Sequence, residues 1–286
     1  MTPDLAASQA ECRAVVTAAE SSFTPAFRLL PQPKRQAMTA LYAFFRRTDD
    51  VADSPEPVEI RRAHLDRWEA NLEACLRGDA AGGIHLALAD AVRRFGVNAD
   101  HLRAVIAGVR MDLEPLSFGT EAELVPYLDR VASAVGLACI PVWGTKPGVT
   151  DADTDAPARA AGRAFQRTNI LRDLGEDARG GRCYLPTVKL ERFGVAWPPT
   201  DSSAFRALVA DQVELAERDY QSSRALGSLL CRDGRAVFGL MSGVYRKLLR
   251  RIAANPAAVL TSRVRVPRPT KLRLLAKAFV MTWGPK

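Results

Sequence analysis

The amino-acid sequence predicts an all-α protein, and three observations support this. Apolar residues recur at spacings of three and four, which is typical of the buried face of a helix. The apolar-polar alternation of a strand is scarce, and Val264-Arg265-Val266 is the only tempting case. Pro and Gly cluster between the periodic segments, as at residues 54–57 and 78–83.

Eight segments carry the helical period. In chain order they are residues 37–45, 65–76, 86–95, 102–109, 124–142, 158–174, 205–226 and 237–252. We expect eight to eleven helices in all, with a loop at residues 145–156 near the middle of the chain. No connection is long enough or biased enough to be a clear linker. Residues 1–286 are therefore expected to form a single helical domain.

Composition limits the classes of function. The chain has 286 residues, 48% of them hydrophobic, and a net charge of +8, which favours anionic partners such as phosphates or lipid surfaces. No recognised nucleic-acid module accompanies that charge, so no nucleic-acid partner is expected. The five cysteines form no CxxC pair, which is simplest to interpret as reduced thiols. With three widely spaced histidines, a histidine metal site is poorly supported.

The location is predicted from hydropathy. Residues 1–20 show no continuous apolar core of a signal peptide, and the longest apolar run, residues 131–143, falls short of the roughly 20 residues of a membrane span. We expect a cytoplasmic protein that is soluble or rests on a membrane without crossing it.

A first acidic cluster lies in the stretch RTDDVAD, directly after an apolar run. Asp49 and Asp53 are four residues apart, so on a helix their carboxylates share a face, and Asp50 broadens the patch. By itself such a cluster is more often a solvated helix face, and Arg46 has the spacing to pair with Asp50.

A second cluster lies in NILRDLGED, more than a hundred residues downstream. Asn169, Asp173 and Asp177 are spaced by four and four, and Arg172 precedes the first aspartate. Carboxylate and amide oxygens suit Mg²⁺, which completes its shell with water and substrate phosphate. Two such faces across a bundle predict a Mg²⁺ site around a diphosphate.

At these residues the sequence resembles the squalene/phytoene synthase family of head-to-head prenyl diphosphate synthases. The signatures are residues 21–53, ending FFRRTDDVAD, and residues 167–186, RTNILRDLGEDARGGRCYLP. The likeness continues through MDLEPLSF, YLDRVASAVGLACIPVWG, VYRKLL and SRVRV. It implies an all-α isoprenoid-synthase bundle with a central cavity, and condensation of two identical prenyl diphosphates through a cyclopropylcarbinyl diphosphate.

The resemblance also implies roles for individual residues. Mg²⁺, with Mn²⁺ as the alternative ion, would be bound by Asp49, Asp50, Asp53, Asn169, Asp173 and Asp177. Arg46 and Arg172 would bind diphosphate oxygens. Positions that contact substrate diphosphate or line the site are matched by Ser21, Ser22, Tyr42, Gln166, Tyr245 and Arg263. Tyr127 matches a tyrosine proposed to assist proton transfer. A dry apolar cavity is expected from Phe23, Phe27, Val131, Val135, Gly136 and Leu137.

Chain length and cofactor use stay open at this stage. The segment around the second cluster favours a phytoene synthase acting on geranylgeranyl diphosphate. The alternative is a presqualene diphosphate or squalene-type enzyme acting on farnesyl diphosphate. Squalene-forming relatives bind NADPH without a GxGxxG motif, so NADPH use is undecided. Arg167 departs from the family pattern and is expected to contact phosphate or to point outward.

Other classes of protein share parts of this pattern. A terpene cyclase or a head-to-tail elongase would carry aspartate-rich helices without the RCYLP segment. A non-catalytic partner subunit would not be expected to keep all the metal-type residues. A basic tail at about 263–286, interleaved with Leu272, Phe279 and Val280, predicts either attachment to anionic lipid or a helix that packs its leucines on the core.

Overall fold

Helices build the whole framework of the described chain. The computed structural model describes residues 2–19, 24–79 and 82–283. Within these ranges it has no β-strand, only one isolated bridge between Thr145 and Leu230. The segment around Val264 and Val266 forms neither helix nor strand, with both valines buried and Arg265 exposed between them. The prediction of an all-α class is confirmed.

The elements follow one another in this order: α1 (Pro3–Ala18), α2 (Thr24–Phe27), α3 (Gln32–Ala52), α4 (Val58–Leu76), α5 (Ile84–Phe95), α6 (Ala99–Met111), α7 (Glu121–Leu128), the π-helical turn η1 (Asp129–Ser133), α8 (Ala134–Trp143), α9 (Asp151–Arg179), α10 (Thr187–Phe193), α11 (Ser203–Ser222), α12 (Arg224–Leu229), α13 (Arg232–Ala254), α14 (Ala258–Thr261) and α15 (Arg268–Trp283). The eight periodic segments are all helical, except that Ser223 interrupts the seventh.

The expected number of helices was too low, and the predicted loop at 145–156 was too long. Several of the additional helices are only one or two turns long, so they show no hydrophobic period. Helix α9 already begins at Asp151. A capping box explains this start, because the Thr150 hydroxyl accepts from the backbone N–H of Asp153, whose carboxylate accepts from that of Thr150.

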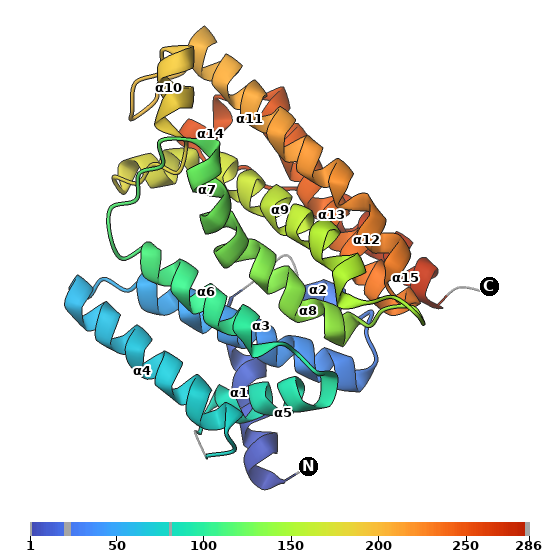
Figure 1. Cartoon of the computed structure of the whole chain (residues 1–286). Helices are drawn as coiled ribbons and strands as arrows, with labels where there is room; N and C mark the ends of the chain where they lie inside the picture. Colours follow the sequence, from blue (N-terminus) through green and yellow to red (C-terminus); the bar gives the residue numbers. More distant parts are fainter. Residues whose placement is uncertain (1, 20–23, 80–81, 284–286) are drawn as a thin grey trace.

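The long helices are arranged in three groups around the centre (Figure 1). Helix α3 packs with α1, α4, α5 and α6 on one side. The continuous rod α7–η1–α8 lies in the middle, and α9 packs on its other side with α11 and α13 behind it. One hydrophobic cluster includes residues from Cys12 on α1 to Ala278 on α15, which supports the proposal of a single domain.

Close helix contacts fix the π-turn η1 at the centre of the rod. A Cβ on Gly162 of α9 would lie 2.4 Å from the Cα of Ser133, and one on Gly108 of α6 would lie 2.8 Å from Arg130 and Val131. Only glycine allows these approaches. Asp129 also accepts two hydrogen bonds from Arg163, at 2.7 and 2.6 Å. The turn is thereby held between α6 and α9.

By length and composition, the rod from Glu121 to Trp143 could cross a membrane. Half of its most apolar 18-residue stretch is buried inside the protein, because this rod forms the central wall of the bundle. Packing against α6 and α9 accounts for its hydropathy.

Candidate active site

A polar pocket brings the two acidic clusters face to face. It is lined by Asp49 of α3, by Asp53 directly after that helix, and by Asn169, Asp173 and Asp177 of α9, and its volume is about 290 Å³. The spacing of four puts each set on one stripe of its helix, and the packing of the rod against both helices opposes the stripes. Two segments more than a hundred residues apart thus share one cavity.

Burial and like charge act together on these carboxyl groups. Desolvation, reinforced by the charge of Asp53, raises the pKa of Asp49 to about 7. Burial, reinforced by Asp173 and Glu176, raises the pKa of Asp177 to about 7 as well. Asp49 is enclosed by protein, yet its side chain is open to the cavity. The charged form of these carboxylates is destabilised in this pocket, so a cation bound beside them would be favoured.

The carboxylates fit a metal that takes few protein ligands. In the described part of the chain, no three His, Cys, Asp or Glu side chains lie close enough to enclose an ion by themselves. Mg²⁺ does not need such an enclosure, because it takes one or two carboxylates together with water and substrate phosphate oxygens. The donor set of two aspartates at the C-terminal end of α3 opposite two aspartates and an asparagine on α9 therefore fits divalent cations around a diphosphate.

Basic side chains surround the same pocket. Arg46 and Arg172 line it, and Arg172 is paired with Asp173. Arg263 donates to Asp173 across 90 residues of sequence, at 3.0 Å. Guanidinium groups hydrogen-bond phosphate oxygens in pairs, so these arginines can exchange a carboxylate partner for a diphosphate.

Asp50 does not belong to this pocket. It lies beside Arg46 and Glu11 in a separate surface depression and pairs with Arg46 at 2.7 Å. A step of 100° per residue turns it away from the face of Asp49. The expectation that it would bind metal is not supported by its position.

Three residues that the sequence analysis did not single out complete the pocket. Asp112 follows the end of α6 and accepts hydrogen bonds from the hydroxyls of Tyr127, at 3.0 Å, and Tyr184, at 3.0 Å. Burial raises the pKa of Asp112 to about 6, against the opposing effect of these two bonds. Arg182 lies 3.5 Å from Asp177 and 3.6 Å from Asp53. Asp112 belongs to the segment MDLEP, whereas Arg182 and Tyr184 belong to the segment RGGRCYLP.

Tyr127 lines the polar pocket, where it is buried. Its ring stacks on that of Tyr184 with centroids 5.4 Å apart, and burial raises its pKa well above the ordinary value. The phenol is thus kept neutral, with its proton directed at the Asp112 carboxylate.

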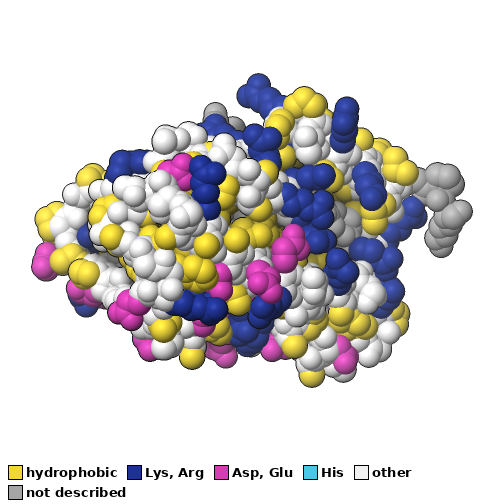
Figure 2. Space-filling view, turned by 90° about the horizontal axis from the view of Figure 1, so that it is seen from above, with side chains coloured by type: hydrophobic (Ala, Val, Ile, Leu, Met, Phe, Trp, Pro, Cys, Tyr) yellow, Lys and Arg dark blue, Asp and Glu magenta, His cyan; other side chains and the backbone are white. Residues whose placement is uncertain are grey.

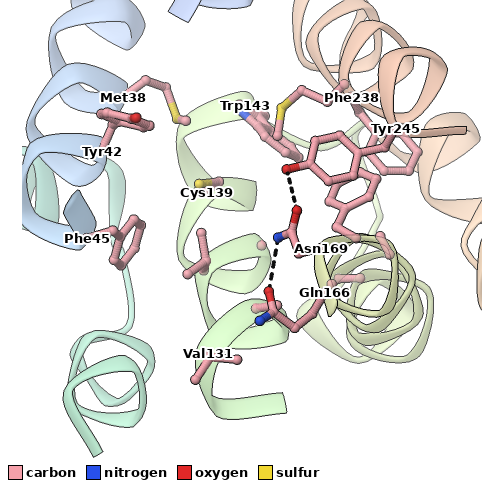
Figure 3. Close-up of a pocket in the computed structure, with 18 of the residues that line it drawn as sticks. Met38, Tyr42, Phe45, Val131, Cys139, Trp143, Gln166, Asn169, Phe238 and Tyr245 are labelled. Carbon is pink, nitrogen blue, oxygen red and sulfur yellow. Dashed lines mark hydrogen bonds between the residues drawn. The ribbon is translucent and has the colours of Figure 1, made fainter. Parts of the chain in front are cut away.

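An apolar pocket of about 280 Å³ adjoins the polar one, and Figure 3 shows residues that line it. Five residues line both pockets: Arg46, Asp49, Val131, Gln166 and Asn169. Further in, the walls are Phe27, Tyr42 and Phe45 on one side and Phe165, Phe238 and Tyr245 on the other. Tyr245 donates to Asn169, at 3.2 Å, and Asn169 donates to Gln166, at 3.1 Å.

One stripe of the central rod runs the length of the apolar pocket. Val131, Val135, Cys139 and Trp143 all line it, each one turn from the next. Burial raises the pKa of the Cys139 thiol to about 12, so it stays neutral in the wall. Leu137 faces a different groove, beside His101 and Asp155, so its predicted place in the cavity was wrong. Phe23, Ser21 and Ser22 lie outside the described residues.

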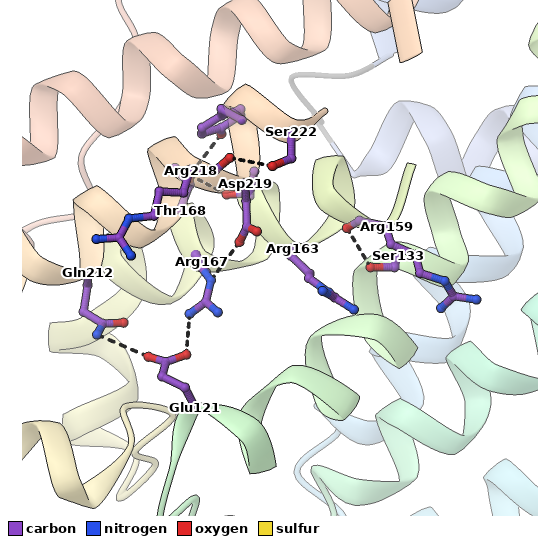
Figure 4. Close-up of polar contacts among 12 residues, drawn as sticks. Glu121, Ser133, Arg159, Arg163, Arg167, Thr168, Gln212, Arg218, Asp219 and Ser222 are labelled. Atoms are coloured by element: carbon purple, nitrogen blue, oxygen red, sulfur yellow. Dashed lines mark hydrogen bonds and ion pairs between the residues drawn. The ribbon is translucent and has the colours of Figure 1, made fainter. Parts of the chain in front are cut away.

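Arg167 takes neither of the positions expected for it. Its side chain is buried and bridges two carboxylates, Asp219 at 2.9 Å and Glu121 at 2.9 Å (Figure 4). Gln212 donates to the same glutamate. Arg167 therefore joins α9 to α7 and α11, on the side of α9 away from the cavity, and helps fix the helix that carries Asn169 and Asp173.

Comparison with known proteins agrees with this geometry. The sequence model of the squalene/phytoene synthase family matches residues 16–270. The chain belongs to this family. Its members are prenyltransferases that act on prenyl diphosphates and generally use a divalent metal.

Individual relatives fall on both sides of the family. The chain is 35% identical to 15-cis-phytoene synthase of Synechococcus elongatus over 284 residues, which cover 94% of this chain and 92% of that protein. It is 36% identical to presqualene diphosphate synthase of Rhodopseudomonas palustris, covering 91% and 94% of the two chains. It is 34% identical to phytoene synthase 3, chloroplastic, of Zea mays, of which it spans only 65%.

Solved structures show the same architecture. A dehydrosqualene synthase in complex with ligand superposes with a TM-score of 0.87 at 29% identity, covering 96% of each chain. The squalene synthase HpnC of Alicyclobacillus acidocaldarius, at 23% identity and a TM-score of 0.79, shares the fold. The predicted isoprenoid-synthase bundle with a central cavity is thereby confirmed.

Proposed function

We propose that this protein condenses two prenyl diphosphates head to head, and specifically that it joins two geranylgeranyl diphosphates into phytoene. One observation carries the proposal: a pocket of acids and arginines opens directly into an apolar pocket, with five residues lining both. A prenyl diphosphate has the same division, with an anionic head and a hydrocarbon tail.

Mg²⁺, with Mn²⁺ as a substitute, would be held by Asp49 and Asp53 at the end of α3 and by Asn169, Asp173 and Asp177 on α9. When bound there, the metal neutralises the diphosphate and so favours its departure as an anion. Arg46 and Arg172 would contact diphosphate oxygens, while Arg263 and Arg182 balance the charge of the surrounding carboxylates. Ser21 and Ser22 remain proposed diphosphate contacts on the strength of the resemblance alone.

The first half of the proposed chemistry, which forms the cyclopropylcarbinyl diphosphate, requires a dry cavity and a route for one proton. The C1–O bond of the first substrate breaks, and its electron pair leaves with the diphosphate. The double bond of the second substrate attacks the allylic cation, and proton loss closes the cyclopropane. Loss of the second diphosphate, rearrangement of the resulting cation and loss of a second proton would then give phytoene. Aromatic side chains such as Phe45 and Phe165 exclude water around the cation.

Tyr127 and Asp112 are suited to receive the first of these protons together. Tyr127 is not a phenolate, because burial raises its pKa. Its hydroxyl would accept the substrate proton while passing its own to Asp112, whose raised pKa makes it a better acceptor than an ordinary aspartate. Tyr184 donates to the same carboxylate and holds it in place.

The second candidate function is condensation of two farnesyl diphosphates to presqualene diphosphate or a C30 hydrocarbon. The identity to a presqualene diphosphate synthase, 36%, is as high as that to the phytoene synthases. Similarity to several phytoene synthases over most of the chain favours the longer substrate. We propose that phytoene formation needs no NADPH.

Product analysis of the purified protein with Mg²⁺ tests the proposal. Each substrate is supplied alone, with and without NADPH. A C40 hydrocarbon from geranylgeranyl diphosphate without NADPH is the expected product. Presqualene diphosphate or a C30 product from farnesyl diphosphate alone would move the assignment to the second candidate, and turnover of neither would contradict both.

We also propose a cytoplasmic location. The five cysteines form no disulfide, which supports it, because reduced thiols are usual in that compartment. Labelling of intact and permeabilised cells with a thiol reagent that does not cross membranes tests this. Reaction of Cys183 or Cys231 in intact cells would contradict it.

A further inference from the structure

The last helix exposes most of the large apolar side chains that the described surface carries. Six such side chains are strongly exposed, and four of them lie on α15: Leu272 (64%), Phe279 (56%), Val280 (65%) and Met281 (44%). The other two, Ile60 and Val188, are far apart on α4 and α10. The apolar exposure is therefore concentrated on one element.

The exposed stripe of α15 lies away from the side of the helix that packs on the protein. The helix lies against α13, where Ala278 and Thr282 are buried and Leu274 contacts the position of Gly243. At 100° per residue, Leu272, Ala276 and Val280 fall on the opposite side of the helix from Ala278. Helix α15 thus has two apolar sides, one packed on the core and one facing outward.

Charge around the outward side has a single sign. Residues 234–286 contain 12 Lys and Arg and no Asp or Glu, whereas residues 1–233 contain 28 basic and 32 acidic residues. On α15 itself, Arg268 lies on one flank of the outward stripe and Arg273 and Lys277 lie on the other. Figure 2 shows basic side chains mixed with apolar ones toward the C-terminal residues of the face in view.

We propose that α15 docks the protein on an anionic lipid surface. Leu272, Ala276, Phe279 and Val280 would insert at the level of the headgroups, while Arg268, Arg273 and Lys277 bind lipid phosphates. Pairing of two copies through α15 would bring one uniformly basic surface against another, which disfavours a second copy as the occupant.

The docked orientation places the membrane close to the apolar pocket. Helix α13, on which α15 packs, contributes Phe238, Met241 and Tyr245 to the wall of that pocket. Only α15 itself and α13 would then lie between the bilayer and the cavity. Docking itself requires no substrate, so the proposal does not depend on the function proposed above.

Flotation of the full chain with vesicles tests this surface. The vesicles contain equal parts of phosphatidylcholine and phosphatidylglycerol, or phosphatidylcholine alone. We expect binding to the anionic vesicles only, falling with added salt. The double variants Leu272→Gln/Val280→Gln and Arg273→Gln/Lys277→Gln should each weaken binding on the order of tenfold or more.

Matched controls keep the test specific. Ile60→Gln/Val188→Gln removes two exposed apolar side chains elsewhere, and Arg13→Gln/Arg67→Gln removes two exposed charges on α1 and α4. Both should leave binding within about twofold, and all four variants should keep the thermal unfolding profile of the parent.

Two outcomes would overturn the proposal. One is absence of binding to anionic vesicles, or binding that the α15 variants do not change. The other is a dimer in solution that Leu272→Gln/Val280→Gln converts to a monomer, which would assign the surface to a second copy.

Discussion

The two ends of the cavity are built on opposite principles. At the polar end, burial and neighbouring carboxylates raise the pKa values of Asp49 and Asp177, and arginines on α9, on the segment after it and on the chain before α15 partly compensate the negative charge. At the apolar end, aromatic and aliphatic side chains pack without charge. The polar end is thus organised around charges that a ligand must supply, and the apolar end around a shape that a ligand must fill.

This contrast predicts that the two ends fail differently when altered. Changes at the polar end should reduce the rate for every prenyl diphosphate. Changes at the apolar end should alter which chain length is accepted while the chemistry continues. The predictions below separate these effects, beginning with the largest.

Replacement of Asp49 by Asn should reduce kcat/KM about a thousandfold with either substrate, because a charged oxygen is lost where the leaving group is stabilised. Steady-state diphosphate release measures this. Asp50→Asn is the matched control, because Asp50 lies outside the pocket, and it should stay within a few-fold of the parent. Equal losses in both variants would contradict the separation of these two aspartates.

The same variant should change how stability depends on pH. The raised pKa of Asp49 means that the folded protein binds more protons than the unfolded chain between about pH 4 and pH 7. Without metal, folding stability should therefore fall as the pH rises through this window. Thermal unfolding should show a shallower fall for Asp49→Asn than for the parent, and identical pH profiles would contradict the pKa shift.

Replacement of Tyr127 by Phe should lower kcat on the order of a hundredfold with little change in KM, because the ring stays and only the proton route is lost. Single-turnover kinetics can locate the loss at cyclopropane formation. Tyr184→Phe serves as the control: it also removes a bond to Asp112 but leaves the route intact, so it should cost clearly less. A larger loss for Tyr184→Phe would reassign the role.

Chain-length preference should respond to the stripe at the apolar end. From Val131 to Trp143 the stripe extends roughly 18 Å, and Trp143 is anchored by its carbonyl, which accepts from Lys34 at 2.7 Å. Cys139→Phe should shift the ratio of kcat/KM toward farnesyl diphosphate by about ten- to a hundredfold, and Trp143→Leu should shift it the other way.

A control on the same rod keeps this interpretation testable. Leu137→Met changes a side chain that faces the separate groove, so the ratio should not move. Competition between the two substrates in one reaction measures all three ratios. If Cys139→Phe and Trp143→Leu shifted the ratio of kcat/KM in the same direction, the stripe would not determine which chain length is accepted.

The smallest expected effect concerns stability at the crossing of α9 and η1. Gly162→Ala should destabilise the fold by roughly 1–3 kcal/mol, because the new Cβ would meet backbone atoms of Ser133 at 2.4 and 2.5 Å. Gly239→Ala on α13 has open space and should stabilise by about 0.5–1 kcal/mol. Urea denaturation measures both, and equal effects would contradict the tight crossing.

The same contrast explains what the sequence could predict. Asp49 and Asp53, and likewise Asn169, Asp173 and Asp177, are related by helical spacing, so a local pattern reveals them. Asp112, Arg182 and Tyr184 come from a helix end and a turn with no period, so only the assembled fold brings them into the pocket.

The errors in prediction have the same origin. Asp50 and Leu137 were assigned to the cavity because they adjoin residues that line it, but one helical step turns each to another face. The position of Arg167 could not be predicted without its partners Glu121 and Asp219, which are distant in sequence. Helix α1 was missed because its alanine-rich sequence shows little amphipathic period.

The most direct measurement is a crystal structure of the protein with Mg²⁺ and the thiodiphosphate analogue of geranylgeranyl diphosphate. The account predicts metal ions bound by Asp49 and Asp173, with Asp50 unbound, and the diphosphate between Arg46 and Arg172. The tail should run along Val135 and Cys139 toward Trp143. A diphosphate outside the acid pocket, or a tail that avoids this stripe, would contradict the division of the cavity into two ends.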